Sequence, residues 1–152
     1  MAGRAGKSIA SRSAFWDTSA LVPLCVRQGT TPQAISFYKS YEVVVWWATS
    51  VEIESALGRL VRMKQLDPLD RIVARKLAAV LADTWWVVQP SDALRAQATL
   101  LVNGHGLRAA DALQLAAALE WCGNAPQGRV FVTADRTLLQ AAVASGFEGK
   151  PL

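Results

Sequence analysis

Short apolar runs rich in β-branched and aromatic residues alternate along the chain with longer segments of helical periodicity. Four of the short runs have the character of strands: Ala14–Asp17, Val43–Trp47, Trp85–Val88 and Arg129–Thr133. The second run is apolar at every position, which is typical of a strand covered on both faces. A further short edge strand is expected in the tail that follows Gly146.

The segments between these runs carry the start and stop signals of helices. The expected helices are Ser19–Val26, Thr31–Tyr41, Thr49–Val61, Leu69–Ala82, a helix from Ser91 to Gly104, Arg108–Trp121 and Thr137–Ala144. We expect Thr18 or Ser19 to cap the first helix and Ser91 to cap the fifth. Thr31 before Pro32 is expected to cap the second helix, with the proline in its first turn.

Strands that alternate with helices predict a mostly parallel sheet with helices on both faces. The length of 152 residues fits one domain. We therefore expect residues 13–152 to form a single domain. The small, polar and basic residues 1–12 are expected to form a flexible N-terminal segment.

Acidic residues occur at the ends of predicted strands and at the starts of the helices that follow them. Asp17 ends the first strand, Asp135 follows the fourth, and Glu52 lies in the first turn of the helix after the second strand. Because strand ends and the following helix starts share one edge of a parallel sheet, we expect these three carboxylates at that edge. Asp111 lies in the first turn of a helix that follows another helix, so the pattern places it there less firmly.

Each acid also has a purely structural interpretation. Thr49 and Glu52 have the spacing of a capping box, Asp17 and Asp135 could cap helices, and Asp111 could gain from a helix dipole. Together, however, four carboxylates would repel one another, at about 4 kcal/mol for a pair roughly 4 Å apart at an effective dielectric near 20. A hard divalent cation with oxygen ligands, Mg²⁺ or Mn²⁺, would supply the missing charge.

The helix around Asp111 favours function over structure. Aspartate is a poor helix former, and the neighbouring residues are small and apolar. No basic residue follows Asp111 at three or four positions, so nothing on that side of the helix neutralises the carboxylate.

Other chemistries find little support. The single histidine, His105, lies between two glycines in an expected turn, and a serine or cysteine triad would have to use it. The sequence has no glycine-rich phosphate loop and no histidines and cysteines at zinc-ligand spacing. The pairs Trp46-Trp47 and Trp85-Trp86 could stack on bases, but their apolar strands favour packing in the core.

The charge and the cysteines of the chain bear on its binding partners and on its cellular compartment. The net charge is +4, yet Arg4, Lys7 and Arg12 supply three of these charges, so bulk charge is weak support for nucleic-acid binding. Cys25 and Cys122 stand alone in apolar surroundings and are expected to be buried free thiols, which favours a reducing cytoplasm. No apolar run reaches the roughly 18 residues of a membrane helix, and no secretory signal is expected.

The chain resembles the PIN-domain ribonucleases and, among them, the VapC-type toxins of type II toxin–antitoxin pairs. The motifs that carry the resemblance are Phe15-Trp16-Asp17-Thr18-Ser19-Ala20-Leu21, Thr49-Ser50-Val51-Glu52, Leu107-Arg108-Ala109-Ala110-Asp111-Ala112-Leu113-Gln114-Leu115-Ala116 and Phe131-Val132-Thr133-Ala134-Asp135-Arg136-Thr137-Leu138. No single motif is specific, but their order, residue types and spacing together are. The resemblance covers the chain from about Ala14 to its end.

The resemblance implies a three-layer α/β/α sandwich around a mostly parallel sheet of four to five strands. It places the four acidic positions of the family on Asp17, Glu52, Asp111 and Asp135. It also implies that Thr133 is a hydroxyl that helps to hold metal or water. Glu54 competes with Glu52 for the second position, although the spacing to Ala56 and Leu57 favours Glu52.

The implied activity is a metal-dependent endoribonuclease that hydrolyses RNA phosphodiester bonds with Mg²⁺ or Mn²⁺. Asp17 and Asp111 would be the central ligands, and Glu52 and Asp135 would complete the site directly or through water. The implied partners are an RNA substrate, a cognate antitoxin and a second copy of the chain. Basic residues at the rim would bind RNA, or would form solvated salt bridges instead: Arg59, Arg62, Lys64, Arg108 and Arg136.

Two further hypotheses remain open at this stage. One is a non-catalytic interaction domain of the same fold, in which the acidic pocket only receives a basic segment of a partner. The other is a phosphatase-like hydrolase with Asp17 as its nucleophile. Ser19 stands two positions after Asp17, where that mechanism would favour a second aspartate.

Overall fold

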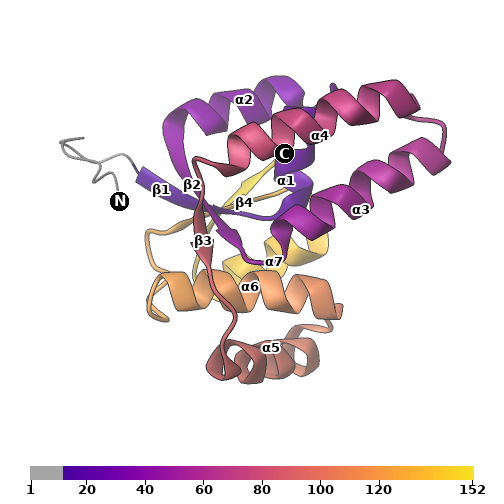
Figure 1. Ribbon diagram of the computed structural model, residues 1–152. Coiled ribbons are helices and arrows are strands. Elements are labelled where there is room, and N and C mark those ends of the chain that lie inside the picture. Colours follow the sequence, from indigo (N-terminus) through magenta and orange to yellow (C-terminus); the bar gives the residue numbers. More distant parts are fainter. Residues whose placement is uncertain (1–11) are drawn as a thin grey trace, which may run out of the picture.

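The computed structural model describes residues 12–152, which form a five-stranded parallel sheet (Figure 1). The strands are β1 (Arg12–Trp16), β2 (Tyr41–Trp46), β3 (Trp86–Val88), β4 (Val130–Thr133) and β5 (Glu148–Pro151). Their order in the sheet is β3-β2-β1-β4-β5, and every neighbouring pair is parallel. The predicted parallel sheet and the extra strand in the tail are therefore confirmed.

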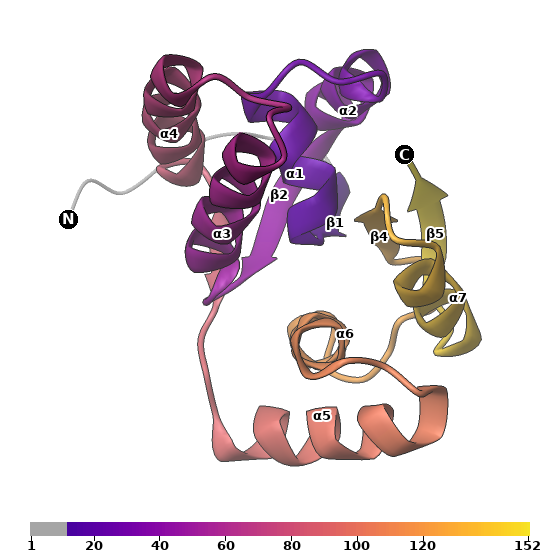
Figure 2. The ribbon, with the colours of Figure 1, turned by 90° about the vertical axis from the view of Figure 1, so that its right-hand side faces the viewer.

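Helices cover both faces of the sheet, as predicted. They are α1 (Thr18–Cys25), α2 (Thr31–Ser40), α3 (Thr49–Arg62), α4 (Pro68–Ala82), α5 (Asp92–His105), α6 (Ala109–Trp121) and α7 (Arg136–Ala144). Figure 2 shows α1 to α4 on one side of the sheet and α5 to α7 on the other. The molecule is thus a three-layer α/β/α sandwich.

Alternation along the strands divides the apolar core into two halves. Phe15 and Phe131 stack against each other on the face covered by α5, α6 and α7. Trp16 and Val132 are wholly buried on the opposite face, under α1 to α4. Because both faces are covered, the central strands read as continuous apolar runs although their side chains alternate between the two layers.

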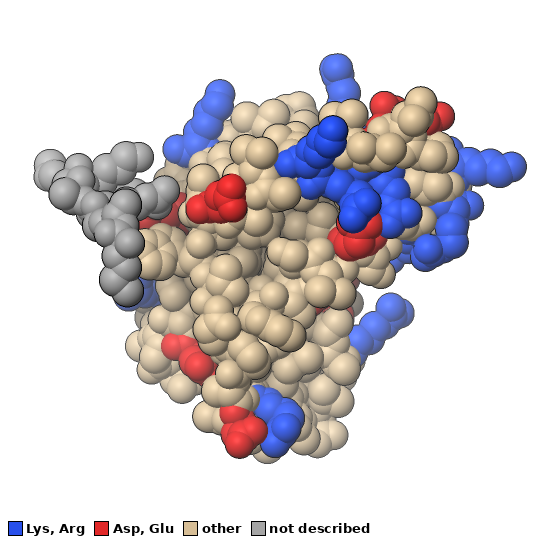
Figure 3. Space-filling model, in the orientation of Figure 1, with Lys and Arg blue, Asp and Glu red and all other residues tan. Residues whose placement is uncertain are grey.

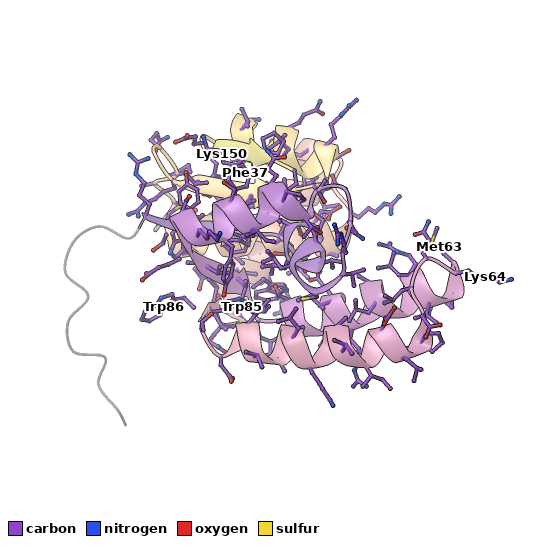
Figure 4. All side chains as sticks on the ribbon, turned by 90° about the horizontal axis from the view of Figure 1, so that it is seen from above. Phe37, Met63, Lys64, Trp85, Trp86 and Lys150 are labelled. Atoms are coloured by element: carbon purple, nitrogen blue, oxygen red, sulfur yellow. The ribbon has the colours of Figure 1, made fainter. Side chains whose placement is uncertain are left out.

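The tryptophan pairs only half follow their predicted place in the core. Trp46 is buried and Trp85 packs partly against the core, whereas Trp47 and Trp86 are 56% and 60% exposed. Core packing is therefore wrong for Trp47 and Trp86. Trp86 belongs to a three-residue strand at the edge of the sheet, and Trp47 follows the end of β2. Figure 4 shows Trp85 and Trp86 at one margin of the molecule, beside the end of α4.

The helix caps correct two expectations and confirm one. Asp17, rather than Thr18 or Ser19, caps α1 by accepting a hydrogen bond from a backbone N–H. Thr31 does not cap α2; its hydroxyl accepts from Gln28 N at 2.8 Å and donates to the carbonyl of Pro23 at 2.7 Å. Ser91 caps α5 as predicted.

The remaining expectations about the chain concern its ends and its isolated side chains. The flexible segment expected at residues 1–12 lies outside the described residues, except for Arg12, which begins β1. Cys25 and Cys122 are free and partly buried, and His105 is exposed at the end of α5. Among residues 12–152, no helix is both long and apolar enough to cross a membrane.

Candidate functional site

Asp17 directly follows the carboxyl end of β1, the central strand, and lies beside the neighbouring strand β4. Its backbone N–H donates to the carbonyl of Val132 at 3.0 Å, which continues the sheet by one residue. The side chain is only 4% exposed. Its Oδ2 accepts hydrogen bonds from Ser19 N at 3.2 Å, from Thr133 Oγ1 at 3.0 Å and from Ser19 Oγ. Among residues 12–152, Oδ1 has no hydrogen-bond partner, so one oxygen is fixed and the other is left over.

The turn between β4 and α7 is tied to Asp17 through two hydroxyls. Ser19 Oγ accepts from Ala134 N at 2.9 Å, and Thr133 Oγ1 accepts from Asp135 N at 3.0 Å. Both hydroxyls then donate onward to Asp17. Asp135 caps α7 by accepting from Leu138 N at 2.8 Å through Oδ1. The structural role considered for Asp135 is therefore present, and it occupies one of its two oxygens.

Glu52 is positioned from α3, and the capping box expected for it does not form. Ala48 occupies the cap position of α3, and the buried Thr49 hydroxyl makes no hydrogen bond. Instead, Glu52 Oε2 accepts from Thr18 Oγ1 and from Gln114 Nε2, both at 3.1 Å. Glu52 is therefore bonded to α1 and α6 rather than to its own helix start, with Oε1 left without a partner among the described residues.

Glu54 faces a different environment, although it is only two residues away. It forms salt bridges with Arg71 and with Arg75, the latter at 2.8 Å, and these lower its pKa. Together with Arg75 it lines a separate hollow of about 600 Å³ between α3 and α4. Two residues correspond to about 200° around a helix, which is why the two glutamates point to opposite sides.

Asp111 completes the electrostatic group from the first turn of α6. Burial, followed by the charges of Asp135 and Asp17, raises its pKa, and the nearby Arg108 opposes this shift only weakly. Burial likewise raises the pKa of Asp17, with a contribution from Asp135. The pKa of Glu52 is raised by burial and by Asp17 and Asp111. Asp17 and Asp111 therefore lie near each other, near Asp135 on one side and near Glu52 on the other, at the edge where the strands end.

No salt bridge neutralises this group within residues 12–152. The salt bridges of the described chain involve Glu54, Asp92 and Glu148, and none involves the four acids at the sheet edge. Over the same residues, no three Asp, Glu, His or Cys side chains lie close enough together to hold one metal ion by themselves.

The chemistry of the donors nevertheless fits a hard cation. All the available ligands are oxygens, and Asp17, Glu52 and Asp135 each combine one hydrogen-bonded oxygen with one oxygen that has no partner among the described residues. Mg²⁺ usually binds proteins through one or two carboxylates and keeps several water molecules. The spacing of these acids therefore suits a hydrated ion better than a closed cage of protein ligands.

A cleft of about 400 Å³ opens beside these acids. Glu52 and Asp111 line it, together with Thr18 and Ser19 from the start of α1. Arg59 follows Glu52 on the same face of α3 and lines the same cleft. The cleft therefore combines acidic groups with one guanidinium, a mixture suited to a metal ion and a phosphate.

The other candidate RNA-binding residues are spread over the surface. Arg108 and Arg136 are exposed at the starts of α6 and α7, and their helices also carry Asp111 and the Asp135 cap. Lys and Arg also gather over the α3–α4 hairpin (Figure 3). The basic residues of that hairpin are Arg59, Arg62, Lys64, Arg71, Arg75 and Lys76.

The raised pKa values predict how stability should depend on pH without metal. A carboxyl whose folded pKa lies above its unfolded value destabilises the fold in its charged form, so its contribution falls as pH rises. For Asp17 this cost begins near the ordinary value of 3.8 and is complete above the raised folded pKa. In EDTA, Asp17→Asn should therefore unfold at a higher temperature than the wild type at pH 7, with the difference vanishing below pH 3.8. Melting curves across this pH range test the prediction, and a lower melting temperature for the variant at pH 7 would contradict it.

Two residues of this site have roles that the sequence patterns do not predict. Ser19 is a candidate helix cap in the sequence, yet its hydroxyl connects Asp17 to the β4–α7 turn. Gln114 has no predicted role within its largely apolar motif, but it is fully buried and donates a hydrogen bond to Glu52. Its signal in the sequence is a polar residue one turn after Asp111, in a helix that is otherwise apolar there.

Fold and site together define a three-layer α/β/α sandwich with a group of carboxylates where its central strands end. No protein-family model and no curated protein matches the sequence. The fold is similar to that of PAE2754 from Pyrobaculum aerophilum, with a TM-score of 0.63 and 22% identity, covering 91% of this chain and 90% of that one. At this level of identity, the likeness shows the fold alone.

Two further solved structures share the fold. One is described as a toxin–antitoxin complex from Klebsiella pneumoniae, with a TM-score of 0.57, 16% identity and coverage of 81% of this chain and 87% of that one. The other is FitAcB from Neisseria gonorrhoeae, with a TM-score of 0.58, 17% identity and coverage of 89% and 96%.

Proposed function

We propose that this protein is a metal-dependent endoribonuclease that uses Mg²⁺ or Mn²⁺ to hydrolyse RNA phosphodiester bonds. The observation that carries the proposal is that the fold gathers Asp17, Glu52, Asp111 and Asp135 at one edge of the sheet, and that none of these carboxylates forms a salt bridge within the described chain. A purely structural group of this kind would be costly, because buried charges are normally paired.

The side chains have distinct parts in this mechanism. Asp17 and Asp111 would hold the cation, with Glu52 and Asp135 completing the site directly or through water. A cation bound there would polarise a phosphate oxygen and lower the pKa of its water. Ser19 and Thr133 fix Asp17 Oδ2 through their hydroxyls, and Thr133 is also the residue proposed to help hold metal or water. No protein nucleophile is required.

Binding of the substrate would depend on basic residues, because the acids alone repel RNA. Arg59 is the best placed, since it lines the same cleft as Glu52 and Asp111. Arg108 and Arg136, which are exposed at the starts of α6 and α7, would contact the phosphate backbone of the RNA. Arg71 and Arg75 are engaged with Glu54 and are weaker candidates.

We further propose that the protein is the toxin of a toxin–antitoxin pair, with an antitoxin protein as its partner in the cytoplasm. The support is the shared fold with a structure described as a toxin–antitoxin complex. The resemblance of the sequence motifs to VapC-type toxins points the same way, and it also suggests a homodimer.

Incubation of the purified protein with a mixture of structured RNAs tests the activity. Cleavage is expected with Mg²⁺ or Mn²⁺ and should stop in excess EDTA, because the acids have no other counter-charge. Asp111→Ala should abolish cleavage as well. Cleavage that persists in EDTA would refute the metal mechanism.

The same variant separates the proposal from a non-catalytic interaction domain. If the acidic group only receives a basic segment of a partner, wild-type protein will not cleave RNA. In that case Asp111→Ala will weaken partner binding without any change in nuclease activity.

A further inference from the structure

Gln114 connects three helices at the edge of the sheet. It lies on α6, is 0% exposed, and stands one turn after Asp111. Its Nε2 donates to Thr18 Oγ1 at 3.1 Å and to Glu52 Oε2 at 3.1 Å. Thr18 Oγ1 donates to the same Glu52 oxygen at 3.1 Å. The three side chains therefore form a closed triangle of hydrogen bonds.

The protons of this triangle can be assigned in one consistent way. The amide of Gln114 has two N–H groups, one for Thr18 and one for Glu52. The hydroxyl of Thr18 accepts one of these and donates its own proton to Glu52. An ionised carboxylate only accepts, so it satisfies both donors through Oε2. Gln114 Oε1 is buried without a partner in the described chain.

Stability alone does not account for a glutamine here. A buried polar atom without a hydrogen-bond partner destabilises the fold, whereas an apolar side chain would suit the surrounding Ala and Leu residues of α6. The amide also adds no charge, so it holds Glu52 without neutralising the carboxylate. A lysine or arginine at this position would neutralise it. The position favours a donor that orients a carboxylate and leaves its negative charge available.

We propose that Gln114 is a positioning residue, which fixes Glu52 Oε2 so that Oε1 alone is presented to a divalent cation. The inference rests on the proposed metal-dependent function and adds a residue to it. Because Gln114 and Asp111 share one face of α6, the same contact also sets the relation between the second and the third acid.

Gln114→Met tests the proposal, because methionine has similar length and no donor. The Mn²⁺ dissociation constant, measured by calorimetry on the full chain, should rise about 10–100-fold, the usual effect of losing a group that orients a metal ligand. The melting temperature in EDTA should not fall. Gln114→Leu is a second variant in case the first does not fold. Gln97→Leu, at a glutamine bonded to Asn124 on the surface, is the matched control and should leave Mn²⁺ affinity unchanged.

A double-mutant cycle with Glu52→Gln decides whether Gln114 acts through Glu52. In the Glu52→Gln background, Gln114→Met should change Mn²⁺ affinity by less than about 2-fold. An equal loss of Mn²⁺ affinity in both backgrounds would overturn the positioning role, and so would wild-type affinity in Gln114→Met. In either case the proposed function still stands if the wild-type protein binds Mn²⁺ and cleaves RNA. Wild-type protein that neither binds Mn²⁺ nor cleaves RNA would overturn both.

Discussion

Asp17→Asn should reduce RNA cleavage in Mg²⁺ by at least about 100-fold, because it removes the negative charge at the most central of the proposed ligands. The asparagine Oδ1 can take the place of Asp17 Oδ2 and accept the hydrogen bonds from Ser19 and Thr133. Its amide then stands where the unpartnered carboxylate oxygen was. The shape of the site is kept while its affinity for a cation is lost.

A thermal-shift measurement with Mn²⁺ separates this loss from unfolding. Wild-type protein should melt at a higher temperature when Mn²⁺ is added, and Asp17→Asn should lose that rise. Asp70→Asn, at an exposed carboxylate in the first turn of α4, is the matched control and should behave like the wild type. An equal Mn²⁺ shift in wild type and Asp17→Asn would place the cation elsewhere.

The sequence predicts the fold well because each strand is marked at both ends. A buried run such as Val43–Trp46 has no polar position that could face solvent, so it requires cover on both sides. Strands of this kind separated by helices leave little choice except a parallel sheet. The edges of the sheet are less certain, because exposure there depends on which strand lies outermost. Trp86 illustrates this, because the run from Trp85 to Val88 is as apolar as the runs that form the central strands.

The position of the acids along the chain also follows from topology, whereas their partners do not. The ends of β1 and β4 must meet at one edge, which brings Asp17 near Asp135. The spacing Thr49-x-x-Glu52 suggests a local capping box, but the glutamate instead bonds Thr18 and Gln114, which are 34 and 62 residues away. Long-range hydrogen bonds of this kind leave no local pattern in a single sequence.

The choice between Glu52 and Glu54 shows what the structure adds. Both are glutamates on α3, two residues apart, and the sequence separates them only by their distance from Ala56 and Leu57. In the fold, Glu52 is coupled to Asp17 and Asp111, whereas Glu54 is held by Arg71 and Arg75 on the side of α4. The charge of Glu54 is already compensated by two arginines, whereas Glu52 forms no salt bridge in the described chain and can offer its charge to a cation.

Glu52→Gln and Glu54→Gln should therefore differ sharply although they are the same substitution on the same helix. Glu52→Gln should lower RNA cleavage and Mn²⁺ affinity by roughly 10–100-fold, since it removes a charged oxygen from the group of acids. Glu54→Gln should leave both within about 2-fold and cost at most about 1 kcal/mol of stability for each of the two partly exposed ion pairs that it weakens. Cleavage rates, calorimetry and melting curves on the two variants provide the comparison. The reverse order of effects would assign the second acidic position to Glu54, and that would move the proposed site out of the cleft that Asp111 shares with Glu52.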